Sequence, residues 1–106
     1  PRTGPLASVN YNFEWDSAKA QSNRRKHGVS FEQAATVFLD PLAVSIVDGE
    51  HGENEERWVT LGKSMDDKLL VAIHTYRETG ENGVTIRLIS VRRATRHEQQ
   101  RYEETR

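Results

Sequence analysis

The chain of 106 residues contains no cysteine and no run of eighteen apolar residues. Without cysteine, neither a disulfide framework nor a thiolate zinc site can form, and a reducing cytoplasm is the expected location. The missing apolar run leaves no candidate for a membrane-spanning helix, and no segment resembles a signal peptide. With 35% apolar and 29% charged residues, the chain is polar for a single domain with one modest core.

The formal net charge of −1 hides an uneven distribution of charge along the chain. The segment DGEHGENEE, residues 48–56, contains five acidic residues and no basic one. Residues 87–101 contain five arginines against the single acid Glu98. Local electrostatic fields, rather than the net charge, decide where a charged partner binds, so these two segments are candidate binding surfaces. An equally good interpretation is that both segments are ordinary solvent-exposed surface.

Three helices are expected from their capping residues. Asp16 can cap the first helix, and Gly28 suits the left-handed residue that ends it. The sequences SFEQ (30–33) and TRHE (95–98) are capping boxes, which mark the starts of the other two helices. The expected helices span about residues 17–27, 30–40 and 95–104.

Between the second and third helices the sequence has the composition of strands. Four runs rich in β-branched and apolar residues are separated by short connections containing Gly, Asn, Asp and Ser, which favour an antiparallel meander. The first ten residues, PRTGPLASVN, show no periodicity and are predicted to be a disordered tail outside a single domain of residues 11–106. The expected strands are residues 42–48, 57–63, 69–77 and 84–92. The fold class is therefore α+β, in the order α-α-β-β-β-β-α.

Several separated blocks of the sequence resemble one family. They are FEWDSAKAQSNRRKHGVSFEQAATVFLDP, ERWVTLG, LLVAIHTYR and IRLISVRRATRHEQQRYEE, in this order. This arrangement is similar to the BrnT family, the toxins of BrnT/BrnA type II toxin–antitoxin modules. The resemblance covers about residues 11–104.

The resemblance implies a RelE-like fold with a four-stranded antiparallel sheet and a ribonuclease activity that needs neither metal nor cofactor. It also implies a cytoplasmic toxin that inhibits translation and growth. Its partner would be a BrnA-like ribbon-helix-helix antitoxin, which neutralises the toxin and, in complex with it, binds operator DNA. The acidic segment 48–56 and the polar last helix are candidate contacts for the antitoxin or for a homodimer.

Metal-free cleavage of RNA proceeds by attack of the 2′-hydroxyl on the adjacent phosphorus, which requires stabilisation of negative charge and transfer of a proton. Arginine suits the first role because its planar fork grips phosphate oxygens and stays charged. Strict alternation along the strand would place Arg87 and Arg93 on one face of the sheet and Arg92 on the other, unless the chain twists or bulges where it leaves the strand. The expected catalytic residues are Arg57, His74, Arg87 and Arg93, and the expected RNA-binding residues are Arg92, Arg96, Lys26 and Tyr102.

Other interpretations of these residues remain open. His74 lies within an apolar run, so a histidine hydrogen-bonded in the core is as good an interpretation as a general base or acid. The four histidines are scattered without metal-ligand spacing, so no metal site is expected. A toxin that poisons DNA gyrase through protein or DNA contacts, without cutting RNA, is the alternative function, because fold alone does not decide activity.

Overall fold

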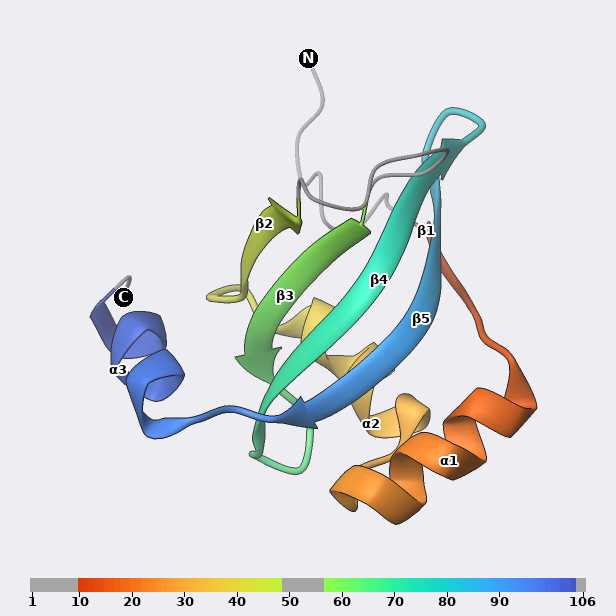
Figure 1. The fold of residues 1–106 in the computed structure, drawn as a ribbon. Helices are drawn as coiled ribbons and strands as arrows, with labels where there is room; N and C mark the ends of the chain where they lie inside the picture. The colour runs from red at the N-terminus through yellow and green to blue at the C-terminus, as the bar shows by residue number, and fades with distance from the viewer. Residues whose placement is uncertain (1–9, 49–56, 105–106) are drawn as a thin grey trace.

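The computed structural model describes residues 10–48 and 57–104. One five-stranded sheet, in the order β1-β5-β4-β3-β2, forms the centre of the molecule. Figure 1 shows α1 and α2 together behind the sheet, whereas α3 lies apart from them, on the side of β2 and β3. None of the helices in these residues has the length and apolar composition needed to cross a membrane. The elements are β1 (Asn10–Glu14), α1 (Ser17–His27), α2 (Phe31–Thr36), the 3-10 turn η2 (Val37–Leu39), β2 (Val44–Asp48), β3 (Arg57–Lys63), β4 (Leu69–Thr79), β5 (Gly83–Arg93) and α3 (Arg96–Glu104).

The α+β class, the three helices and the four expected strands are confirmed, but the purely antiparallel four-stranded sheet is wrong. A fifth strand, β1, pairs in parallel with β5 along Gly83–Arg87. It begins at Asn10, one residue inside the segment expected to be a tail. Its sequence, NYNFE, has two asparagines and little strand propensity, so its pairing partner, about seventy residues away in the chain, decides its conformation.

The hydrophobic core lies between the sheet and the two helices behind it. Phe31, Ala34 and Val37 of α2 and η2 are fully buried against side chains from β4 and β5. The buried strand residues in this cluster are Leu70, Ala72, Val84, Ile86, Leu88 and Val91. We call the opposite side of the sheet the open face, because neither α1 nor α2 covers it (Figure 1).

Local capping explains where the first two helices begin. The Asp16 carboxylate accepts hydrogen bonds from Ala18 and Lys19, and Gly28 ends α1 at a φ of 75°. At α2 the Ser30 hydroxyl accepts from the Gln33 N–H at 3.0 Å, while the Gln33 side chain accepts from the Ser30 N–H at 2.7 Å. Both capping boxes expected from the sequence are therefore formed, since Thr95 and Glu98 make the same reciprocal bonds at α3.

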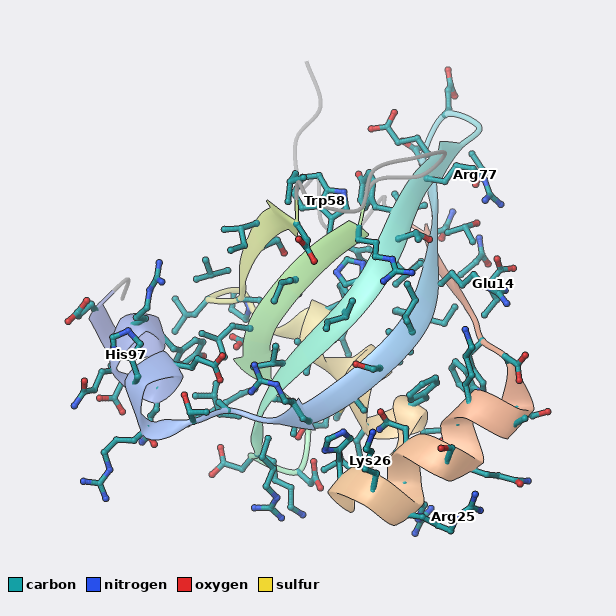
Figure 2. All side chains as sticks on the ribbon, in the orientation of Figure 1. Glu14, Arg25, Lys26, Trp58, Arg77 and His97 are labelled. Carbon is teal, nitrogen blue, oxygen red and sulfur yellow. The ribbon has the colours of Figure 1, made fainter. Side chains whose placement is uncertain are left out.

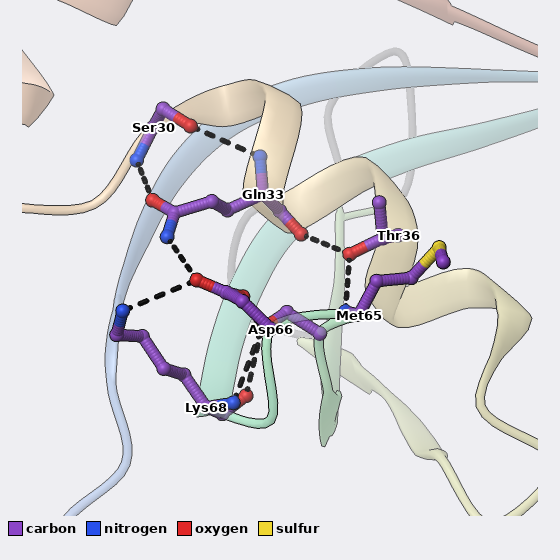
Figure 3. Close-up of polar contacts among 7 residues, drawn as sticks. Ser30, Gln33, Thr36, Met65, Asp66 and Lys68 are labelled. Atoms are coloured by element: carbon purple, nitrogen blue, oxygen red, sulfur yellow. Dashed lines mark hydrogen bonds and ion pairs between the residues drawn. The ribbon is translucent and has the colours of Figure 1, made fainter.

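The capping box of α2 also joins the helix to the turn between β3 and β4 (Figure 3). Gln33 donates to Asp66 at 2.7 Å, and Thr36 accepts from the Met65 N–H at 2.9 Å. Hydrogen bonds from Ser64, Gln33 and Lys68 hold the pKa of the Asp66 carboxyl well below its usual range. One polar network therefore sets where α2 sits against the sheet.

A bulge in β5 changes which side chains face the helices. His74 pairs with Leu88 and Ile73 pairs with Ser90, so Ile89 is an extra residue without a partner in β4. Beyond Ile89 the alternation therefore reverses. The prediction that Arg87 and Arg93 share a face is wrong: Arg93 pairs with the core residue Leu70, while Arg87 lies on the open face.

Asn23 holds β5 just beyond this bulge. β1 covers the edge of β5 only as far as Arg87, and farther along the strand the Asn23 side chain takes the place of a pairing strand. Its Oδ1 accepts from the Val91 N–H at 3.1 Å, and its Nδ2 donates to the Val91 carbonyl at 2.9 Å. Asn23 is only 7% exposed, so both backbone groups depend on it.

Replacing Asn23 with leucine, which has a similar shape, is expected to destabilise the protein by roughly 1–3 kcal/mol, because two buried backbone groups of Val91 lose their partners. Urea denaturation measures this change. Ser22→Ala, at the exposed neighbouring position of α1, is the control and should change stability by less than about 0.5 kcal/mol. Equal stability of the two variants would contradict the role given to Asn23.

Candidate functional site

Three arginines gather on the open face. Arg57 of β3 and Arg87 of β5 both pair with Thr75 of β4, so the three residues form one row across the sheet. The backbones of Arg57 and Arg87 are two strand spacings apart, roughly 10 Å. Arg77 follows Thr75 by two residues, faces the same side, and lies diagonal to Arg87 at roughly 7–8 Å. We call Arg57, Arg77 and Arg87 the arginine cluster.

The surroundings of the arginine cluster fit a site for a large anion. Thr75 is only 6% exposed although no helix covers it, because long side chains flank it on both sides. Arg87 contacts one carboxylate, Glu14 of β1, at 3.6 Å, and both side chains remain 46% exposed. In Figure 2, Arg77 and Glu14 lie along the side of the sheet formed by β4, β5 and β1. Guanidinium groups that share one face repel one another, and a phosphate bound between them would relieve that repulsion.

The structure places His74 on the other face, inside the core. It is 2% exposed and packs edge-on against Phe38, with ring centroids 4.9 Å apart. Its Nδ1 lies 2.9 Å from the Thr75 carbonyl, which can only accept, so Nδ1 carries the hydrogen. In the neutral ring Nε2 then accepts from the Thr60 hydroxyl at 2.7 Å, and Thr60 in turn bonds Ser45.

This burial lowers the pKa of His74 below its ordinary value of 6.5, although the bond to the Thr75 carbonyl opposes the shift. In the unfolded chain His74 binds a proton more readily than in the folded protein. Stability should therefore be complete above about pH 6.5 and fall as the pH falls below that value. Urea denaturation between pH 5 and 7 checks this. His74→Gln should flatten the dependence, and an unchanged slope in this variant would contradict the assignment.

Arg92, Arg93 and the start of α3 do not form a shared phosphate site in this structure. Arg92 donates two hydrogen bonds to the Glu98 carboxylate, at 2.9 and 2.8 Å. These bonds raise the pKa of Arg92 and lower that of the Glu98 carboxyl to about 2. Glu98 therefore already supplies the anion at the first turn of α3, while Arg93 lines a different pocket together with Lys63, Lys68 and Tyr102.

The remaining expected RNA-binding residues do not lie together: Tyr102 is buried, whereas Lys26 and Arg96 are exposed on different helices. Tyr102 is 4% exposed, and its hydroxyl donates to Asp40 at 2.7 Å. Burial raises the pKa of the Asp40 carboxyl. Hydrogen bonds donated by the Lys63 N–H, the Tyr102 hydroxyl and the Leu42 N–H outweigh this effect and keep the pKa below its usual range. Lys26 is exposed on α1 (Figure 2), and Arg96 is exposed on α3.

Of the four expected catalytic residues, the structure brings together Arg57 and Arg87 and separates them from His74 and Arg93. Arg77 was not among the expected residues. The signal that could have found it is its spacing of two from Thr75 within HTYR. Among residues 10–48 and 57–104, no three histidine, cysteine, aspartate or glutamate side chains are grouped to hold a metal ion. The acidic segment 48–56, which was expected to contact the antitoxin or a second copy of the chain, lies outside the described residues except for Asp48.

The fold and this face define a small α+β protein with a single mixed sheet, α1 and α2 on one side and a cationic surface on the other. A family model described as "Ribonuclease toxin, BrnT, of type II toxin-antitoxin system" matches residues 15–98. The chain therefore belongs to the BrnT family of ribonuclease toxins, which confirms the resemblance noted in its sequence blocks.

One solved structure supports the same fold. The 1.1 Å crystal structure of the Brucella abortus ribonuclease toxin, BrnT, matches with a TM-score of 0.52 and 23% sequence identity. The match covers 82% of this chain and 100% of that chain. A comparison with curated protein sequences gives no match. At this identity the likeness concerns the fold, and the roles of individual residues are argued from the geometry described above.

Proposed function

We propose that the open face binds RNA and that the arginine cluster stabilises the transition state of its cleavage. The observation that carries this proposal is the row Arg57–Thr75–Arg87 with Arg77 beside it. Family membership supports ribonuclease activity, and this row is the part of the open face where several guanidinium groups can reach one phosphate.

The proposed reaction is an internal transfer at phosphorus. The 2′-oxygen loses its proton and bonds to the adjacent phosphorus, while the bond from phosphorus to the 5′-oxygen breaks. The 5′-oxygen gains a proton, so the products are a 2′,3′-cyclic phosphate and a 5′-hydroxyl. Negative charge grows on the phosphoryl oxygens during this step, and fixed guanidinium groups lower its free energy. No metal-bound water is needed, so we propose a metal-independent reaction.

Within this proposal His74 supports the site rather than carrying the proton. Its ring is buried, and both nitrogens are engaged by Thr60 and by the carbonyl of Thr75. Because Thr75 lies between Arg57 and Arg87, a bond to its backbone helps to hold the row in register. His74 therefore acts on the arginines through the sheet.

The biological role that we propose follows from the family. A ribonuclease of a toxin–antitoxin module would arrest translation and growth when it is free of its antitoxin. The antitoxin would be a BrnA-like ribbon-helix-helix protein, and operator DNA would be bound through the complex. The cytoplasm, which holds both RNA and operator, is the proposed location.

The test uses purified, folded protein, free of antitoxin, and a short RNA oligonucleotide in buffer with EDTA. We expect cleavage, with the 5′ fragment ending in a cyclic phosphate whose mass is one water lower than that of the linear phosphate. Intact RNA under these conditions would overturn the metal-independent proposal. If RNA stays intact with added Mg²⁺ as well, while expression still arrests growth, the gyrase-poison alternative is favoured.

A further inference from the structure

A second feature of the open face, next to the arginine cluster, has no role in the chemistry proposed above. An apolar groove of about 130 Å³ runs between the sheet and α3. Its lining residues are Val44, Ile46, Val59, Leu61, Val71, Glu98 and Arg101. Cavities of roughly 150 Å³ lined by aliphatic side chains hold a benzene ring, so this groove can take one large apolar side chain.

The side of the sheet that bears the groove is unusually apolar for a surface. Ile46, in the middle of β2, is 55% exposed, and Val44, Val59 and Leu61 line the groove on the same side of the sheet. β2 is the last strand of the sheet and pairs only with β3 in the part of the chain that the structure describes. Edge strands usually carry charged residues or proline that prevent pairing, but in β2 the single charged residue is Asp48, at its end. Such an edge fits a polypeptide partner.

We infer that the groove is the docking site of the antitoxin, and that it receives an amphipathic segment with one apolar anchor and acidic residues beside it. This inference rests on the proposed function for the identity of the partner. The apolar anchor would fill the space over Ile46 and Val59. The acidic residues would meet Arg101 at the rim and the arginine cluster farther along the same face.

The lining and the charges of the groove favour an antitoxin segment over single-stranded RNA and over a second copy of this chain. The groove is lined by aliphatic side chains, whereas single-stranded RNA is held by aromatic stacking and cationic grooves. A second copy of the chain, docked through the same face, would bring a second Arg57, Arg87 and Arg101 into the same interface. Like charges facing one another oppose that assembly, and an acidic segment removes the conflict. The antitoxin would then cover groove and arginines together.

The test measures binding of the purified cognate antitoxin, co-expressed from the same operon and then separated, to purified toxin variants by calorimetry. We expect Ile46→Gln to weaken the affinity at least about tenfold, because it removes the apolar contact with the anchor. Arg101→Glu should also weaken binding by reversing the charge at the rim. Met65→Gln is the matched control, since Met65 is 75% exposed in the turn between β3 and β4 and does not line the groove, and it should bind like wild type.

Circular dichroism and thermal melting establish that each variant is folded, and cleavage of RNA by Ile46→Gln and Met65→Gln should match that of wild type. Wild-type affinity of Ile46→Gln would overturn the docking site. So would a wild-type dimer in gel filtration that Ile46→Gln converts to monomer, because the groove would then bind a second copy. Weakened antitoxin binding together with no cleavage by wild type would support the docking site and overturn the RNA proposal.

Discussion

Replacing Arg87 with alanine is expected to lower the rate constant of RNA cleavage by ~10²–10³, the usual effect of removing one preorganised donor from a transition state. Arg87 lies on the open face, half exposed, in line with Thr75 and Arg57. Negative charge on the phosphoryl oxygens grows in the transition state, so the loss of this cation should fall on kcat more than on KM. Single-turnover cleavage of a short RNA oligonucleotide measures the effect.

Arg25→Ala is the matched control for this measurement. Arg25 is exposed on α1, behind the sheet (Figure 2), so its removal changes the net charge by the same amount without touching the arginine cluster. We expect less than a threefold change, within roughly 0.7 kcal/mol. Arg87→Lys separates charge from geometry, because lysine keeps the charge but cannot donate the paired bonds. Equal rates for Arg87→Ala and Arg25→Ala would overturn the assigned site.

Replacing His74 with alanine is expected to destabilise the fold by about 3–4 kcal/mol. The substitution leaves a cavity beside Phe38 and removes the histidine nitrogens that lie 2.7 Å from the Thr60 hydroxyl and 2.9 Å from the Thr75 carbonyl. Urea denaturation at pH 7.5, where the ring is neutral, measures the loss. His97→Ala, at an exposed position of α3, should change stability by less than about 0.5 kcal/mol.

A milder variant distinguishes support from proton transfer. His74→Gln keeps a polar side chain of similar reach, so the folded variant should cleave RNA within about tenfold of wild type and with the same pH dependence. A general base or acid contributes ~10²–10⁴ to the rate. A loss of that size in folded His74→Gln, with one limb of the pH profile gone, would contradict the supporting role and restore His74 as a catalytic residue.

The order of apolar residues in β5 held information that strict alternation missed. Val84, Ile86 and Leu88 are spaced by two, but the next buried residue is Val91, three positions on. That change of spacing is the mark of a bulge, and the unpaired Ile89 occupies it. Its consequence is large, since it moves Arg92 to the open face and Arg93 away from it. Neighbouring residues with the same chemistry therefore have different roles.

β1 and Arg77 were missed for a different reason. The strand NYNFE has no strong pattern of its own and forms because β5 offers it an unpaired edge. Arg77 is one of fifteen basic residues in the chain, and no local pattern separates it from the rest. Only the register between β4 and β5 brings it beside Arg87.

The sequence by itself determined the helices, four of the five strands and the family. These features depend on residues a few positions apart: caps at Asp16, Ser30 and Thr95, turn-forming connections, and short sequence blocks that occur in the family's order. The tertiary structure alone decided which side chains meet. Strand pairing over long separations and the packing of Phe38 against His74 place Arg57, Arg77 and Arg87 on one surface and His74 beneath it. Free energies of pairing and burial between distant residues, which no local spacing encodes, select that arrangement.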